Sequence, residues 1–229
     1  MLHLKGGTFS MMISPETFYC EHLEGKSADE IQRVIRGLKQ EIGRLKNIAE
    51  HPKYQCMIMP NESTRIFWNR KYLEQAKIAL IEAGGTYTPS QAEIKAMEFE
   101  DNIPFIEKIV FTIGSFCGGY TTVTIQINNT IHKYAEHSLA PQPSPPPDYD
   151  GNHAMSREDF FHQFSELHIG EWRKNYNLRR FGYDVLDGEQ WSLELYFSNG
   201  HKPVKIYGDN AYPYNFDSLQ DLIYNSAGM

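Results

Sequence analysis

One segment near the C-terminal end constrains the fold more than any other part of the chain. In the run QWSLELYF, residues 190–197, apolar residues occupy every second position, and a period of two residues predicts a half-buried β-strand. Asn199 and Gly200 then supply residues that tolerate the positive φ of a tight turn. Val204 and Ile206 return as the partner strand. The segment therefore predicts an antiparallel hairpin, followed by an aromatic, turn-rich loop over Tyr207–Tyr214.

The size and composition allow one large domain or two small ones with a full core. The chain has 229 residues, of which 41% are hydrophobic and 13% aromatic, so its composition is not that of a disordered protein. It contains no apolar run of about 18 residues, so we expect no membrane span. Its first residues carry no secretory signal. We expect residues 1–12 to be an extension or a disordered lead, with the patterned protein starting at Met11 or Met12.

The cysteines indicate the redox compartment of the protein, and the charge distribution indicates whether it binds DNA. The three cysteines, Cys20, Cys56 and Cys117, show no paired spacing, which favours a reducing cytoplasm and small buried hydrophobes over disulfides or nucleophiles. Residues 1–104 carry 13 basic and 14 acidic side chains, a net charge of −1, and residues 105–229 carry 9 basic and 15 acidic ones, a net charge of −6. Non-specific DNA binding by the acidic second half is therefore not expected.

Residues 13–103 have the pattern of a helical module. Ser27 and Glu30 form a capping box that opens a long helix with apolar residues at helical spacing, and Pro52 helps to stop it. Gly84 and Gly85 end a later helix in the left-handed manner. We expect helices at about Ser14–Leu23, Ser27–His51, Asn69–Ala83 and Thr88–Glu100, the last with Thr88 as its N-cap, and an irregular segment over Lys53–Phe67.

Residues 104–229 predict an α+β domain. Alternation over 109–113 and β-branched residues over 121–127 indicate a second hairpin, and residues 131–137 extend the sheet. The proline-rich stretch 141–150 predicts an exposed loop. A helix begins at Ser156 and includes His168 and Trp172, the tract to Asp187 is loop-like, and a last helix spans 217–224. The order ββ-α-ββ-α predicts a four-stranded antiparallel sheet with helices on one face.

The aromatic loop after the last strand is the best candidate for a partner-binding surface. Rigid aromatic rings and amides are enriched at protein interfaces, and the same rings can instead cover a sheet edge and pin the last helix. We weigh both interpretations equally. The candidate residues are Trp172, Tyr207, Asn210, Tyr212 and Tyr214.

Two alternative sites are weaker. Basic residues on the helices of residues 27–77 could contact nucleic acid, although interleaved glutamates favour a solvated face with ion pairs. A hydrolase could use His162 or His168 with Glu166, Glu171 or Asp187, if these groups share a pocket. His132, Glu136 and His137 lack the spacing of a zinc site, so we expect no metal and no cofactor. The basic candidates are Arg33, Arg36, Lys39, Arg44, Arg70 and Lys71.

Three long segments carry a family resemblance. The runs ISPETFYCEHLEGKSADEIQRVIRGLKQEIGRLKN, ESTRIFWNRKYLEQAKIALIEAGGTYTPSQAE and VLDGEQWSLELYFSNG, with YGDNAYPYNF, resemble a family of uncharacterised proteins of gut Firmicutes and their conjugative or phage-like elements. The resemblance covers nearly the whole chain and brings no activity and no catalytic residue. It implies a bacterial cytoplasmic protein of mobile-element origin.

These observations favour a binding or regulatory protein over an enzyme. A full core and an aromatic loop occur without a metal cluster, a phosphate-binding loop or a nucleophile motif. We therefore expect a non-enzymatic protein with a protein partner, and in a narrower version a mobile-element inhibitor of a host defence nuclease. Nucleic-acid binding and a His/carboxylate hydrolase are the alternatives. The oligomeric state is left open by the sequence.

Overall fold

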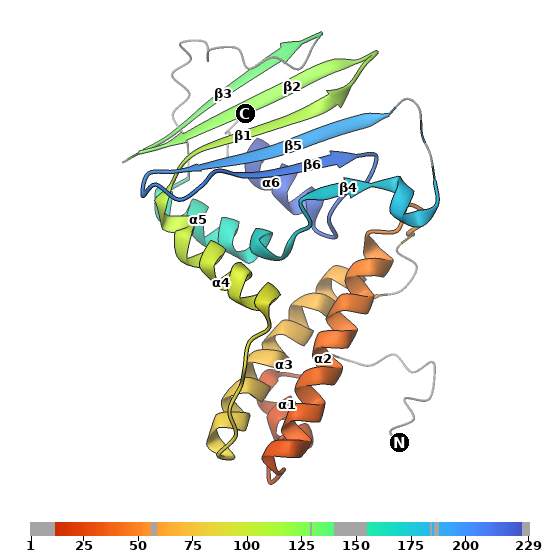
Figure 1. The fold of residues 1–229 in the computed structure, drawn as a ribbon, viewed down its shortest axis with the longest axis vertical. Helices are drawn as coiled ribbons and strands as arrows, with labels where there is room; N and C mark the ends of the chain where they lie inside the picture. The colour runs from red at the N-terminus through yellow and green to blue at the C-terminus, as the bar shows by residue number, and fades with distance from the viewer. Residues whose placement is uncertain are drawn as a thin grey trace. The chain divides into compact units, whose positions relative to one another are not determined.

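The protein divides into two compact units. The computed structural model describes residues 12–55, 59–128, 130–139, 155–183, 185 and 188–225 (Figure 1). The first unit comprises residues up to 49 together with 54–88, and the second comprises 50–53 together with the chain from Pro89 onward. The predicted boundary at Pro104 falls within the second unit. The predicted lead and the proline-rich loop 141–150 lie outside the described residues, apart from Met12.

The first unit is built from three helices, α1 (Pro15–His22), α2 (Ala28–Ala49) and α3 (Glu62–Glu82). Its core includes Phe18, Ile31, Ile35 and Leu80, so the apolar stripe predicted for the long helix is buried as expected. The Glu30 carboxylate accepts from the backbone N–H of Ser27 at 2.9 Å, as predicted for the start of α2. These contacts confirm the helical module of the first unit.

Two predicted helix starts are wrong. Helix α3 begins at Glu62, seven residues before the predicted Asn69, because the Asn61 side chain accepts from the N–H of Thr64 at 2.8 Å and caps the helix earlier. Helix α4 (Gln91–Asn102) is capped by Ser90, whose capping box closes on Glu93 rather than running from Thr88 to Gln91. In both places, several capping residues stand close together, and the choice among them depends on the packing of the helix.

The second unit contains a six-stranded mixed sheet, which corrects the predicted four-stranded antiparallel one. The strands lie in the order β3-β2-β1-β5-β6-β4, and all neighbours are antiparallel except β4 and β6. Both predicted hairpins are confirmed, and residues 131–138 extend the sheet as expected. The strands are β1 (Ile106–Ser115), β2 (Gly119–Ile127), β3 (Ile131–Ser138), β4 (Asn175–Asn177), β5 (Glu189–Phe197) and β6 (Val204–Asp209).

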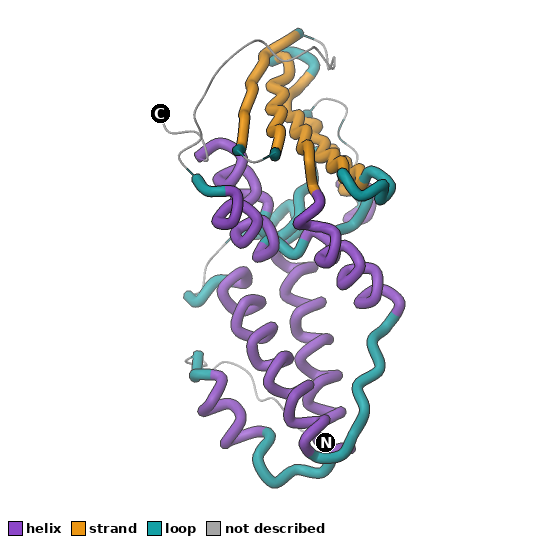
Figure 2. Tube along the Cα trace, turned by 90° about the vertical axis from the view of Figure 1, so that its left-hand side faces the viewer, coloured by secondary structure: helices purple, strands orange, loops and turns teal. Residues whose placement is uncertain are grey.

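Helices α4, α5 (Arg157–Glu166) and α6 (Phe216–Asn225) pack on one face of this sheet. Phe160 and Phe164 of α5 and Leu219 of α6 are buried in one cluster with Phe111 of β1 and Leu193 of β5. Figures 1 and 2 show these helices on the same side of the strands. The core of the second unit therefore lies between the sheet and its helices, as predicted.

The tract between α5 and β5 is more ordered than the sequence indicates. Helix α5 ends at Glu166, so His168 and Trp172 are not on it, contrary to the prediction. A short 3-10 turn, η2 (Ile169–Glu171), takes the place of the end of the predicted helix, and β4 and a second 3-10 turn, η3 (Leu178–Phe181), lie in the region predicted as a loop. A strand of three residues lacks the length that a periodic pattern needs, and its partner residues in β6 lie 32 residues further along the chain.

Two of the three cysteines are exposed rather than buried. Cys20 lies on α1, and Cys117 lies in the turn between β1 and β2. The prediction that each cysteine is a small buried hydrophobe is wrong for these two. Cys56 lies outside the described residues.

Candidate functional site

The face of the sheet opposite the helices is polar. Alternate residues of β5, such as Trp191 and Leu193, are buried toward the helices, so Gln190 and Ser192 lie on the other face, which we call the open face. The strand register aligns open-face residues in rows across the sheet. One row contains Thr122, Thr112, Ser192, Tyr207 and Asn175, and the next contains Tyr120, Gly114, Gln190, Asp209 and Asn177.

Most residues of these two rows line a groove of about 640 Å³. Its wall on one side comes from β4 and from Arg179 of η3, and its floor comes from β5 and β6. A volume of this order lies in the range of small-ligand sites, and the lining combines amides, hydroxyls and charged groups with aromatic rings. The lining residues are Thr112, Tyr120, Asn175, Tyr176, Asn177, Arg179, Gln190, Trp191, Ser192, Tyr207, Gly208 and Asp209.

Gly114 of β1 is a point of close approach between β1 and β2 beside the groove. It lies between Tyr120 on one side and Gln190 on the other, and the Tyr120 hydroxyl donates to Gln190 Oε1 across it at 3.2 Å. A Cβ at Gly114 would meet the backbone of Gly119 at 2.1 Å. In the neighbouring row, the hydroxyls of Thr112 and Thr122 lie 3.0 Å apart. The floor is thus held by hydrogen bonds between strands.

The polar lining carries one basic and one acidic side chain. Arg179 is exposed on η3, and Asp209 is exposed at the end of β6, where its carboxylate accepts from the Asn210 amide at 2.7 Å. Tyr176 is buried, and its hydroxyl accepts from the backbone N–H of Arg173 at 3.1 Å. Burial raises the pKa of Tyr176, so it remains a neutral phenol at physiological pH. The groove therefore offers neutral hydrogen-bonding groups with a balanced pair of charges.

Tyr207 is the one predicted partner-binding residue that lines the groove. Its side chain projects from the open face of β6 and is 45% exposed. The other four candidates come after β6 or before β4, and the structure does not place them in this lining. Tyr214 is half-buried just before α6.

Three of the other candidates make contacts within the second unit: Trp172, Tyr212 and Asn210. Trp172 packs edge-to-face on Trp191, with ring centroids 6.4 Å apart. Tyr212 packs on Phe216 at 4.9 Å. The backbone N–H of Asn210, at a φ of 53°, donates to the Glu189 carbonyl at 2.9 Å. The packing interpretation of the aromatic loop thus accounts for these three residues.

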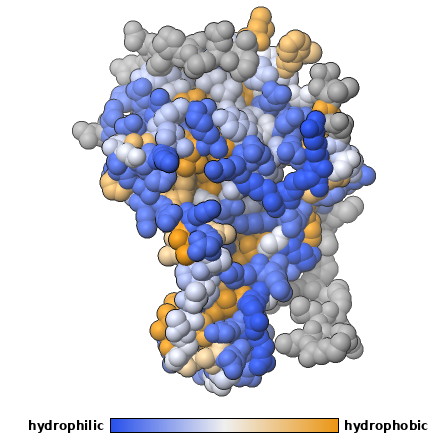
Figure 3. Space-filling model, in the orientation of Figure 1, coloured by the Kyte–Doolittle hydropathy of each residue, from blue (hydrophilic) through white to orange (hydrophobic). Residues whose placement is uncertain are grey.

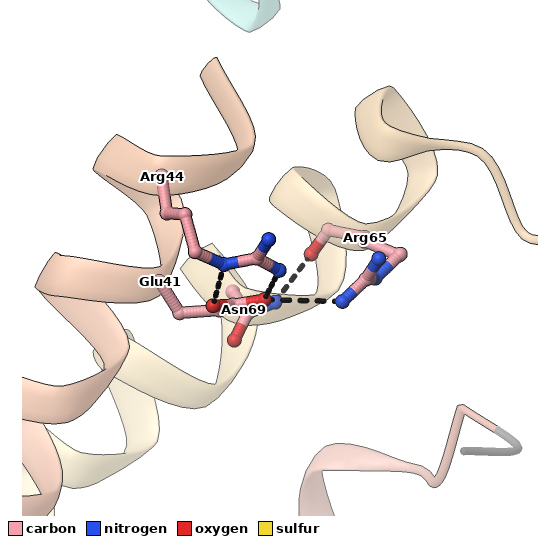
Figure 4. A network of polar contacts seen from close by, with 4 residues as sticks. All are labelled: Glu41, Arg44, Arg65 and Asn69. Atoms are coloured by element: carbon pink, nitrogen blue, oxygen red, sulfur yellow. Dashed lines mark hydrogen bonds and ion pairs between the residues drawn. The ribbon is translucent and has the colours of Figure 1, made fainter. Parts of the chain in front are cut away.

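The basic residues of the first unit are partly engaged in ion pairs. Figure 4 shows Glu41 accepting from Arg44 through two bonds of 2.7 Å and from Arg65 at 3.1 Å. The Arg44 guanidinium holds the pKa of Glu41 below its usual range. Asn69 donates to the Arg65 carbonyl at 2.7 Å beside this network.

The other basic candidates are also distributed over contacts and solvent. Lys71 lies 3.7 Å from Glu74, and Lys39 lies 3.4 Å from the Tyr87 hydroxyl. Arg70 is half-buried, and Arg33 and Arg36 are exposed on α2. This is the solvated, ion-paired face that the interleaved glutamates favoured.

The residues of the predicted hydrolase site do not line the groove. His162 and Glu166 are exposed on α5, and His168 Nδ1 lies 4.0 Å from a carboxylate oxygen of Glu100. Glu171 is exposed in η2, and Asp187 lies outside the described residues. The groove thus has no histidine with which these carboxylates could act as a general acid–base pair.

Three further features of the described residues concern other kinds of site. No group of three or more His, Cys, Asp or Glu side chains in this part of the chain is arranged to hold a metal ion. No helix among the described residues is long and apolar enough to cross a membrane. Phe116 and Leu139 are each 85% exposed at one end of the sheet, where Figure 3 shows hydrophobic residues projecting, but two side chains are too few for an extended apolar patch.

The fold and the groove define an α+β protein with a polar open-face groove, and comparisons assign it no relative. No protein-family model, no curated protein and no solved structure matches the chain. The resemblance to proteins of gut Firmicutes and their mobile elements stays a prediction. The groove is therefore the feature of the molecule that indicates a function.

Most residues that line the groove were not predicted as site residues, although the sequence contains part of the pattern that assigns them to one face. The alternation that predicted β5 also assigns Gln190 and Ser192 to one face, together with Tyr207 and Asp209 once the hairpin register is known. Asn175 and Asn177 carried no such signal, because β4 is short and its partner is distant in sequence, and Arg179 lies in the turn η3 that follows it.

Proposed function

We propose that this protein acts by binding another protein, with the groove on the open face of its sheet as the binding site. The observation that carries the proposal is the juxtaposition of exposed Tyr207 and Arg179 in one groove whose other lining residues are mostly polar. Tyrosine and arginine are the residue types that most often dominate interface energetics. The amides and hydroxyls around them suit a polar rim.

The charge of the groove argues for a protein partner rather than a polyanion. Its lining has one arginine and one aspartate, so it neither attracts a phosphate backbone nor imitates one. A partner loop with an acidic side chain for Arg179 and a hydrogen-bond donor for Asp209 matches this pair. Inhibition of a nuclease by competition with nucleic acid would need a predominantly acidic surface, and the groove does not favour that narrower version.

Photo-crosslinking from a single position tests the proposal. Benzoylphenylalanine replaces Tyr207 in one variant and Tyr196 in a matched control, and crosslinked proteins from the native host are identified by mass spectrometry. Tyr196 lies on the same open face of β5 but outside the groove lining, where its hydroxyl donates to Glu194 at 2.5 Å. We expect a protein partner that is captured from position 207 and not from position 196.

Binding of the captured partner is then measured with purified variants. Tyr207→Ala and Arg179→Ala should each weaken binding by about 2 kcal/mol, or about thirtyfold, if they are central anchors. Tyr196→Ala should leave the affinity within a few-fold of wild type. Circular dichroism checks that all variants are folded. Equal capture from both positions, or an affinity that Tyr207→Ala leaves unchanged, would contradict the proposal.

A further inference from the structure

The strand β3 is the outer strand of the sheet, and it has few of the features that protect such edges. Among the described residues it pairs only with β2, in an unbroken register of eight residue pairs. Exposed edges are usually blunted by proline, by bulges or by outward-facing lysines. β3 contains neither proline nor a bulge, and the Nζ of its one lysine, Lys133, donates to the Tyr224 carbonyl of α6 at 3.2 Å.

The hairpin turn shows which backbone groups of β3 face outward. The N–H of Asn128 donates to the Thr130 carbonyl at 3.0 Å, just beyond the facing pair Ile127 and Ile131. In an antiparallel ladder, hydrogen-bonded pairs recur at every second residue, so His132, Tyr134 and Glu136 direct their backbone groups to β2. The N–H and C=O groups that point away from β2 belong to Ile131, Lys133, Ala135 and His137.

We infer that β3 pairs antiparallel with β3 of a second copy, which makes the protein a homodimer with a continuous sheet. A two-fold axis perpendicular to the sheet keeps the two open faces on the same side. Even-numbered residues of one β3 must therefore face even-numbered residues of the other, and odd-numbered residues must face odd-numbered ones. With Tyr134 at the axis, Lys133 faces Ala135, and each N–H and C=O of this pair meets its counterpart. This inference is independent of the proposed partner groove.

The charges of β3 select this register over its neighbours. With Tyr134 at the axis, His132 of each copy faces Glu136 of the other in a close, non-hydrogen-bonded pair. A shift that places Lys133 at the axis would oppose two lysines. A shift that places Ala135 at the axis would set Lys133 against His137 and would separate His132 from Glu136. Like charges directly opposite are destabilising, so one register is favoured.

The neighbourhood of His132 and Glu136 suits this pairing. His132 Nε2 lies 2.8 Å from Thr130 Oγ1, which orients the ring on the open face and leaves Nδ1 as the nitrogen for Glu136 of the second copy. The partner groove is lined by residues from β2 across to β4 and contains no residue of β3. The dimer would therefore present two grooves on the same face, and a partner with two binding sites could engage both.

Sedimentation equilibrium of the full chain over a range of micromolar concentrations tests the inference. We expect the wild type to reach twice the mass of one chain. Glu136→Lys places lysine against His132 in both symmetric pairs and should raise the dimer Kd about tenfold or more. The double variant with His132→Glu and Glu136→Lys restores opposite charges and should recover most of the wild-type affinity.

A backbone variant gives a second, independent readout. Ala135→Pro removes an N–H that points away from β2, so it should abolish the dimer while the β2–β3 ladder remains, as circular dichroism would report. A wild-type protein that stays monomeric throughout would overturn the inference. So would a dimer whose Kd is unchanged in Glu136→Lys, whatever the proline variant does. Rescue by the charge-swapped double variant distinguishes β3 pairing from a general effect of charge.

Discussion

Gly208 of β6 is a position at which a single added methyl group should strongly perturb the second unit. A Cβ at this position would lie 1.8 Å from Nε1 and 2.1 Å from Cε2 of Trp191. Ordinary Cβ contacts begin at 3.4 Å, so the indole or the strand would have to shift by more than 1 Å. Gly208→Ala therefore tests the packing of the sheet against its helices and the floor of the groove together.

The expected loss of stability in Gly208→Ala depends on the contacts of the Trp191 indole. Trp191 is 2% exposed, its Nε1 donates to the Ala211 carbonyl at 2.9 Å, and its ring lies 4.7 Å from Phe216. Overpacking of a core costs about 1–3 kcal/mol. Displacing the indole would also leave a buried donor without its acceptor, at about 1–3 kcal/mol. We expect Gly208→Ala to lower the free energy of unfolding by about 2–5 kcal/mol.

Scanning calorimetry and denaturant unfolding followed by tryptophan fluorescence measure this effect. For a chain of this size, the expected loss corresponds to a fall in Tm of about 5–15 °C. Gly37→Ala on α2 is the matched control, because a Cβ there meets no atom within 4 Å. If Gly208→Ala unfolds at the same denaturant midpoint as the wild type, the indole does not lie over Gly208 and the reasoning fails.

The remaining predictions concern local interactions. Gly37→Ala should stabilise the first unit by about 0.5–1 kcal/mol, since alanine loses less backbone entropy in a helix; a lower midpoint in urea would contradict this. Ser90→Ala removes the N-cap of α4, so we expect a loss of about 1 kcal/mol by the same assay, and no loss would exclude the capping box with Glu93. Glu41→Gln should cost about 0.5–1 kcal/mol at neutral pH, as the pair with Arg44 is only partly buried. Because the folded-state pKa of Glu41 lies below its unfolded value, this contribution to stability is present above the unfolded pKa and is lost as the pH falls through the folded pKa. Urea titrations from neutral to acidic pH should therefore show that the stabilities of the wild type and Glu41→Gln converge. A constant difference in stability would refute the assignment.

Helix ends were predicted less well than helix existence. The apolar spacing of α2 and the left-handed Gly84 that follows α3 are local features, and the structure confirms both. The starts of α3 and α4 were misplaced because several residues near each start can cap a helix, as Thr88 and Ser90 do before α4. Which of them caps depends on where packing begins, and that is not a local property.

The candidate site likewise contains residues that local sequence features predict and residues that depend on the tertiary structure. Tyr207 could be named from the sequence because an aromatic residue at the end of a predicted strand is a local observation. Its neighbours in the groove could not be named with it, since Arg179 and Asn175 lie in a tract without periodicity. Conversely, Trp172 and Tyr212 look like interface residues in sequence, yet they are partly buried and pack against the core.

The sequence by itself determined the hairpin of β5 and β6, the hairpin of β1 and β2, most helices and the side of β5 that faces the core. Those features follow from residue spacing within a few turns or strands. Only the tertiary structure decided that β4 adds to β6 in parallel, that β3 ends as an edge strand, and that two rows of polar residues form one groove. These features depend on register between segments far apart in the chain, and pairing over such distances leaves no periodic trace in either segment.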